Sequence, residues 1–159
     1  MTSLSQLLTP TCIRLGADIT SKKKALESLA QLLTETDAAL DFDATFTALT
    51  AREKLGSTAI EHGVAIPHCR VDHCRQPRAA ILTLRQGIDF DARDGCSTDI
   101  LLALIVPTES TDEHLKILAL LADTLQRQAT RDTIRKSTDA AMLYHGLSQL
   151  EPRADQPIV

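Results

Sequence analysis

The feature that most constrains the fold is an uninterrupted apolar run from Ile100 to Val106, inside the segment "TDILLALIVP". A short run of this kind, ended by Pro107, is typical of a β-strand that is buried on both faces. It is far shorter than the roughly 20 apolar residues that a membrane-spanning helix needs. We therefore expect a central strand in a sheet that helices cover on both sides, and no insertion into a membrane.

Helix-forming segments lie on both sides of this strand. Apolar residues recur at helical spacing after Ser21, a favourable N-cap, and Gly56 follows the next periodic segment as a candidate C-cap. A later helix is expected to open at Ser110 or Thr111, with Glu113 as the capping-box partner. The segments predicted to be helical are 4–8, 22–36, 43–54, the stretch from this cap to residue 126, and 138–150.

Further strands are predicted between these helices. They are the segments "CIRLG" (12–16), "GVAI" (63–66) and "AAILTLRQGIDF" (79–90), the last with a turn at Gln86–Gly87. Pro67 has no backbone N–H to offer to a strand ladder, so we expect pairing to stop there and His68 to lie at a strand end. Helices at both ends of the chain with strands between them predict an α/β layered protein.

Composition excludes some classes of function. A chain of 159 residues is expected to form one domain, which is enough to bury a core without metals or disulfides. Aromatic residues make up 3% and the net charge is -4, so binding to nucleic acid is not expected. The N-terminal stretch lacks the pattern of a signal peptide, and we expect a cytoplasmic protein with reduced cysteines.

The stretch "EHGVAIPHCRVDHCR" (61–75) is the most unusual, with three of the five histidines and two of the four cysteines. Zinc is one interpretation, because this stretch offers His68, Cys69, Asp72, His73 and Cys74 as ligands. The spacing matches no familiar zinc motif, and adjacent side chains on an extended segment point to opposite faces. A reactive thiol at Cys69 is a second interpretation. We expect neither a metal nor a cofactor.

A third interpretation makes His68 a nucleophile. A neutral imidazole, with an ordinary pKa of about 6.5, can accept a phosphoryl group near neutral pH and release it again. His114 lies in the first turn of the helix after Pro107, where free backbone N–H groups favour an anion. Arg52 precedes the turn Gly56-Ser57-Thr58, whose hydroxyls and amides we expect to face a phosphate.

These residues belong to segments that together resemble a known family. The segments are "AREKLGSTAIEHGVAIPHCR", "GIDFDARDG", "DILLALIVP" and "EHLKILALLADTL". They look like the enzyme IIA domain of the fructose–mannitol class of the bacterial phosphotransferase system, and most of all its free-standing nitrogen-regulatory form. The resemblance covers nearly the whole chain. It implies one domain over residues 1–150, with a central mixed β-sheet flanked by helices, and a frayed tail at 151–159.

The resemblance also implies a role for each residue of the candidate site. His68 would be phosphorylated on its tele nitrogen, Nε2, by the phosphohistidine of a small HPr-like phosphocarrier. His114 would stabilise the phosphoryl group, and Arg52 would lie beside it. Two positions depart from the family pattern: Cys69 stands where a small residue such as Gly is usual, and Glu61-His62-Gly63 stands where a Gly-Asn-Gly type of turn is usual.

The expected function is regulatory. Phosphorylation would add a charge of about -1.5 to -2 to a surface cleft and so change the binding of target proteins, such as kinases or transporters. One alternative is a sugar-specific enzyme IIA that passes its phosphoryl group to a separate enzyme IIB. A second alternative is a binding module that has kept the fold without the phosphoryl chemistry, or a metal-binding protein.

Overall fold

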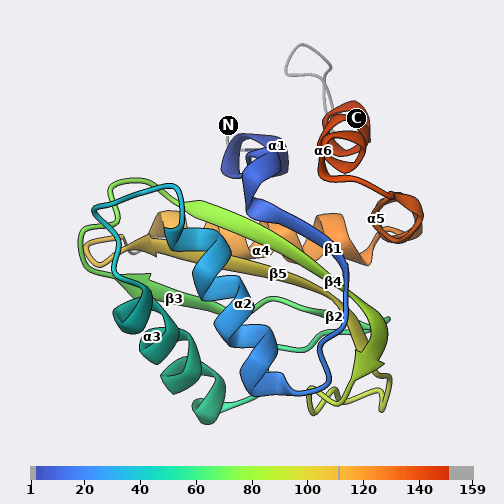
Figure 1. Cartoon of the computed structure of the whole chain (residues 1–159), viewed down its shortest axis with the longest axis horizontal. Coiled ribbons are helices and arrows are strands. Elements are labelled where there is room, and N and C mark those ends of the chain that lie inside the picture. The colour runs from blue at the N-terminus through green and yellow to red at the C-terminus, as the bar shows by residue number, and fades with distance from the viewer. Residues whose placement is uncertain (1–2, 111, 151–159) are drawn as a thin grey trace.

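The mixed sheet at the centre of the molecule is built around the long apolar strand (Figure 1). The computed structural model describes residues 3–110 and 112–150. Its strands are β1 (Ile13–Ala17), β2 (Val64–Ala65), β3 (His68–Val71), β4 (Arg78–Ile88) and β5 (Thr98–Pro107). Its helices are α1 (Leu4–Leu7), the 3-10 turn η1 (Pro10–Cys12), α2 (Lys22–Thr34), α3 (Phe42–Leu55), α4 (Asp112–Gln126), α5 (Gln128–Lys136) and α6 (Ala140–Leu150).

Strand β5 lies in the middle of the sheet. It pairs antiparallel with β4 on one side, and β4 in turn pairs parallel with β1. On its other side, β5 pairs parallel with β2 and then with β3, so these two short strands form one edge of the sheet. Ala65 lies opposite Leu101, and His68 lies opposite Leu104.

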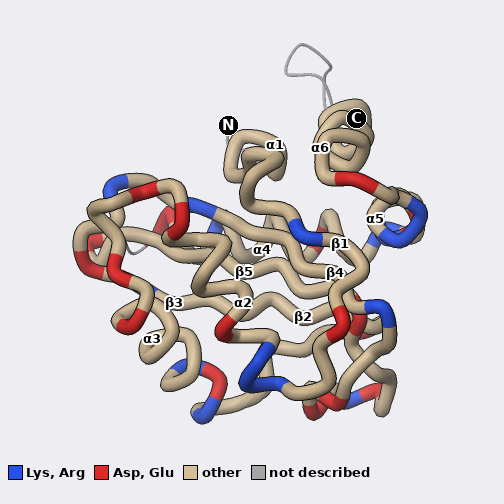
Figure 2. The backbone as a smooth tube through the Cα atoms, in the orientation of Figure 1, with Lys and Arg blue, Asp and Glu red and all other residues tan. Residues whose placement is uncertain are grey.

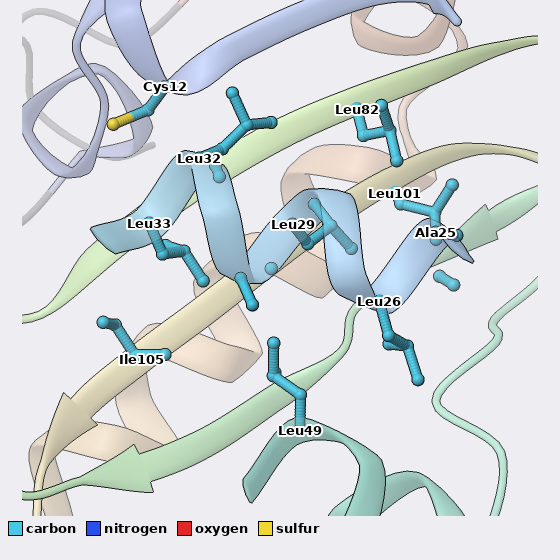
Figure 3. Packing of buried hydrophobic residues seen from close by; sticks show 14 of the residues in the cluster. Cys12, Ala25, Leu26, Leu29, Leu32, Leu33, Leu49, Leu82, Leu101 and Ile105 are labelled. Carbon is cyan, nitrogen blue, oxygen red and sulfur yellow. The ribbon is translucent and has the colours of Figure 1, made fainter. Parts of the chain in front are cut away.

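Helices cover both faces of the sheet. Helices α2 and α3 pack on one face, where Leu29 and Leu49 meet Leu101 and Ile105 (Figure 3). Helices α1, α4, α5 and α6 contribute to the core on the opposite face, which includes Leu104. Because side chains alternate along a strand, successive residues of β5 enter the two cores in turn. The predicted α/β class, with a central mixed sheet flanked by helices, is therefore confirmed.

Several local predictions are also confirmed. Ser21 caps α2, since its side chain accepts a hydrogen bond from the N–H of Lys24, and Gly56 ends α3. None of the helices in the described part of the chain has the length and apolar composition needed to cross a membrane. Thr111 and the tail at 151–159 lie outside the described residues, so the predicted cap at Thr111 and the frayed tail stay predictions.

One prediction about the strands is wrong, and another is confirmed only in part. Strand β4 continues through Gln86–Gly87 to Ile88, and the pairing only shifts its register between Thr83 and Ile88. Gly87 serves there as a point of close approach, because a Cβ would lie 2.7 Å from the Cβ of Ser97. The chain reverses later, between β4 and β5.

The expected interruption at Pro67 is present but short, because β2 ends at Ala65 and β3 begins at His68. Although proline has no N–H, its carbonyl accepts a hydrogen bond from the N–H of Leu104 at 2.9 Å. Strand β3 then begins at His68, which therefore lies at the start of a strand and not at the end of one.

Helix α5 was not predicted as a separate element. Its sequence, "QATRDTIRK", is mostly polar and buries little besides Thr130, Arg131 and Ile134. The buried guanidinium of Arg131 donates a hydrogen bond to the carbonyl of Leu125 at the end of α4, which ties the two helices together. With only Ala129 and Ile134 apolar, the segment lacks the apolar stripe from which the other helices were predicted.

Candidate functional site

The candidate site lies at the edge of the sheet formed by β2 and β3. Helix α3 packs against β3, and Cys69 and Val71 point into the core that α3 shares with α2. Because side chains alternate along the strand, His68 faces the opposite way. There its ring meets the ring of His114 from α4 edge-on, with centroids 5.6 Å apart and planes at 67°. The structure therefore brings together the two histidines that the sequence singled out.

The ring of His68 is oriented by its own backbone. Its Nδ1 lies 2.8 Å from the carbonyl oxygen of Ile66, on the far side of Pro67. A carbonyl oxygen can only accept a hydrogen bond, so Nδ1 carries the proton of the neutral ring and donates it. This leaves Nε2 with a free lone pair, which makes Nε2 the nucleophilic nitrogen.

The surroundings keep His68 neutral. Burial lowers the pKa of its imidazole below the ordinary value, and the positive charge of Arg52 lowers it further. The hydrogen bond to Ile66 and the negative charge of Glu53 raise the pKa and offset part of this effect. A neutral, partly buried ring with a fixed tautomer is suited to nucleophilic attack near pH 7.

His114 is buried without a partner for one of its nitrogens. The residue is 8% exposed, and its Nδ1 has no hydrogen-bond partner among the described residues. Burial, followed by the nearby His68 and Arg70, lowers the pKa of this ring as well. Buried polar atoms are nearly always hydrogen-bonded, so this unpaired nitrogen destabilises the folded protein.

Arg52 lies in the last turn of α3 and supplies positive charge to the site. Its Nη1 donates a hydrogen bond to the carbonyl of Gly56 at 3.0 Å. A guanidinium carries five N–H donors, so this bond leaves others available to an anion. The positive charge of Arg52 also contributes to the lowered pKa of His68.

The turn Gly56-Ser57-Thr58 is held by contacts of its own. The hydroxyl of Ser57 donates to the carbonyl of Phe90. The hydroxyl of Thr58 donates to Oε2 of Glu53 at 2.6 Å, and the N–H of Thr58 donates to Oε1 at 3.0 Å. In this arrangement the two hydroxyls shape the loop. Their direct contact with a phosphate stays a prediction.

Sequence reasoning missed Glu53, the acceptor in both of these bonds. It is buried, and it lies on the inner face of α3 one turn after Leu49. A carboxylate at the spacing of the apolar residues is unusual, because a buried charge needs partners. The position of Glu53 on the apolar face of the helix was the feature of the sequence that could have identified it as a buried carboxylate.

The two departures from the family pattern lie away from the ring of His68. Cys69 is 7% exposed and faces the core, and burial raises the pKa of its thiol to about 12. It therefore neither crowds His68 nor acts as a reactive thiolate. The side chain of Glu61 is exposed, and the carbonyl of the neighbouring His62 accepts a hydrogen bond from Arg135.

Neither a metal centre nor the neighbouring cavity accounts for this arrangement. Within residues 3–110 and 112–150, no three His, Cys, Asp or Glu residues are grouped so that they could hold a metal. A cavity of about 460 Å³ lies near the start of β5 and is lined by Asp99 and Arg135 among others, but not by the candidate site residues.

At this sheet edge a partly buried histidine with a fixed tautomer meets a second histidine, and the positive charge of Arg52 lowers the pKa of His68. Residues 6–149 match the family described as "Phosphoenolpyruvate-dependent sugar phosphotransferase system, EIIA 2". The chain belongs to this family of phosphotransferase components.

Individual relatives point to the regulatory branch of the family. A "Nitrogen regulatory protein" of Pseudomonas aeruginosa is 42% identical over 144 residues, which covers 91% of this chain and 94% of that protein. The crystal structure of the nitrogen regulatory protein IIA-Ntr from Neisseria meningitidis matches with a TM-score of 0.82 and 33% identity, covering 91% of this chain and 98% of the other. A "PTS system fructose-specific EIIA component" of Haloferax volcanii is 31% identical over 94% of this chain and 97% of its own length. The chain is thus homologous to nitrogen-regulatory IIA proteins.

Proposed function

We propose that this protein carries a phosphoryl group on Nε2 of His68, and that it receives the group from the phosphohistidine of an HPr-like phosphocarrier. The observation that carries the proposal is the contact between a partly buried imidazole, His68, and a buried one, His114, at the sheet edge. One has its Nδ1 held by the carbonyl of Ile66, and the other, His114, has its Nδ1 unpaired.

This geometry supports the following transfer. The lone pair of His68 Nε2 forms a new bond to phosphorus, while the bond between phosphorus and the carrier's nitrogen breaks and returns its electron pair to the carrier. The hydrogen bond from His68 Nδ1 to Ile66 persists, so no proton has to leave the ring. Arg52 and His114 supply donors to the phosphoryl oxygens, whose charge is greatest during transfer.

Phosphorylation then serves as a signal. It adds a charge of about -1.5 to -2 at the sheet edge, which changes the proteins that can dock there. The similarity to nitrogen-regulatory proteins supports a regulatory role toward target proteins such as kinases or transporters, in the cytoplasm. The fructose-specific relative supports a second candidate function, in which the phosphoryl group passes to a separate enzyme IIB.

The proposal is tested by incubating the protein with phosphoenolpyruvate, enzyme I and the phosphocarrier, and measuring its mass. We expect one added phosphoryl group that is lost in acid. His68→Gln should gain none, while His73→Asn, at an exposed histidine of the same stretch, should gain as much as the parent. An acid-labile phosphate on His68→Gln, or none on the parent protein, would overturn the proposal. Rapid passage of the phosphoryl group to a sugar-specific enzyme IIB would favour the second candidate function.

A further inference from the structure

A buried carboxylate lies close to the candidate site and has no part in the transfer itself. The side chain of Glu53 is 4% exposed. Its Oε1 accepts a hydrogen bond from the N–H of Thr58 at 3.0 Å and forms an ion pair with Lys22 Nζ at 2.9 Å, and its Oε2 accepts a hydrogen bond from the hydroxyl of Thr58 at 2.6 Å. Burying a carboxylate is unfavourable unless it is paired and hydrogen-bonded in this way.

Lys22 connects this carboxylate to the rest of the fold. It is the first residue of α2, and it also lies 3.3 Å from the carboxylate of Asp91 and 4.5 Å from the ring centroid of Phe90. Figure 2 shows the basic start of α2 close to the charged end of α3 at the lower rim of the molecule. Glu53 therefore joins the start of α2, the end of α3 and the loop before β2.

A continuous series of hydrogen bonds leads from Glu53 to the phosphoryl acceptor. Glu53 holds Thr58 by its N–H and its hydroxyl. The carbonyl of Thr58 accepts the N–H of Ile66 at 3.0 Å. The carbonyl of Ile66 accepts the Nδ1 proton of His68 at 2.8 Å. Every step in this series is a direct contact, and Ile66 belongs to the segment that directly precedes His68.

We propose that Glu53, held by Lys22, is a positioning residue for His68: through Thr58 and Ile66 it fixes the carbonyl that sets the tautomer and orientation of the imidazole ring. The proposal rests on the proposed function of His68. Second-sphere hydrogen bonds of this kind set which ring nitrogen is available for chemistry.

Electrostatics gives this role a separate signature. From α3, the negative charge of Glu53 raises the pKa of His68 and the positive charge of Arg52 lowers it. From α4, His114 packs against the ring, and Arg70 of β3 acts on His114. Neutralising Glu53 should therefore lower the pKa of His68, in addition to loosening the hydrogen bond that selects its tautomer.

Glu53→Gln and Thr58→Val test the proposal, with Thr58→Ser as the matched control. The first change removes the charge of the acceptor, and the second removes only the hydroxyl at nearly constant volume. Thr58→Ser keeps both donors to Glu53. Long-range ¹H–¹⁵N spectra of the imidazole report the tautomer and the pKa of His68. Phosphorylation rates are measured with the phosphocarrier and with phosphoramidate, a small donor that needs no docking surface.

We expect the parent and Thr58→Ser to show the Nδ1–H tautomer, and Glu53→Gln and Thr58→Val to show a mixture of tautomers. The pKa of His68 should fall in Glu53→Gln. Both donors should phosphorylate these two variants roughly 10- to 100-fold more slowly, the range expected from slight misplacement of a reacting group. If Glu53→Gln and Thr58→Val leave the tautomer, the pKa and both rates unchanged, the proposal is wrong, even when they lower the melting temperature.

The two proposals fail in different ways. If the parent protein is never phosphorylated on His68, the proposed function fails, while the tautomer and pKa measurements still report on positioning. If Glu53→Gln does not fold, Thr58→Val answers the same question, because Glu53 keeps its bonds to Lys22 and to the N–H of Thr58.

Discussion

Replacing His114 by leucine should make the protein more stable and less active. The imidazole is 8% exposed with its Nδ1 unpaired, so the folded protein has lost the hydration of that nitrogen without gaining a partner for it. Leucine has a similar volume and can fill the same space beside Ile117 and Leu118 without an unpaired polar atom. The substitution thus separates the contribution of His114 to folding from its contribution to transfer.

The magnitudes follow from these contacts. An unpaired buried polar group costs about 1–3 kcal/mol, so His114→Leu should raise the free energy of unfolding by about 1 kcal/mol or more. For a chain of this size each kcal/mol corresponds to roughly 2–4 °C in the melting temperature. Loss of one donor to the phosphoryl oxygens should slow transfer from the carrier roughly 100- to 1,000-fold.

Urea unfolding and rapid-quench phosphorylation by the carrier measure the two effects. His145→Leu, at an exposed position on α6, is the control and should change neither quantity appreciably. If His114→Leu is less stable than the parent and is phosphorylated at the parent rate, then His114 is an ordinary core residue. The proposed role of His114 in the transfer would then be wrong.

Three further predictions concern titration, thiols and the core. The free energy of unfolding should fall as the pH falls below about 6.5 toward the lowered native pKa values, because the unfolded chain then binds protons that native His68 and His114 do not. Urea titrations across this range should show a smaller fall in His68→Gln. An equal fall would contradict the lowered pKa of His68. A thiol reagent should label exposed Cys96 in the native protein while Cys69, buried and with a pKa of about 12, stays unlabelled, as peptide mapping would show; rapid labelling of Cys69 would refute its inward orientation. Leu104→Ala should lower the free energy of unfolding, measured by urea titration, by about 2–5 kcal/mol. Leu55→Ala, at a residue that is 85% exposed, should leave it nearly unchanged. Equal effects of the two substitutions would contradict the central position of β5.

Much of the architecture could be predicted from local pattern. The apolar run of β5 predicted a central strand because every one of its side chains must leave water, whichever face it points to. The caps at Ser21 and Gly56 bounded two helices for reasons that involve only their own neighbouring residues. His68 and His114 were candidates because an imidazole near neutral pH is reactive wherever it is placed.

Tertiary structure decided the rest. Pro67 has the same local chemistry whether or not Leu104 donates to its carbonyl, and only the position of β5 shows that it does. The direction in which Cys69 points depends on the pairing of β3. The buried carboxylate of Glu53 is stabilised only because Lys22 of α2 and Thr58 of the loop after α3 contact it. Most of these contacts join residues far apart in the chain, and the orientation of Cys69 follows from strand register. Local hydrophobic periodicity carries no information about them, because their free energy exists only once the sheet and its covering helices have assembled.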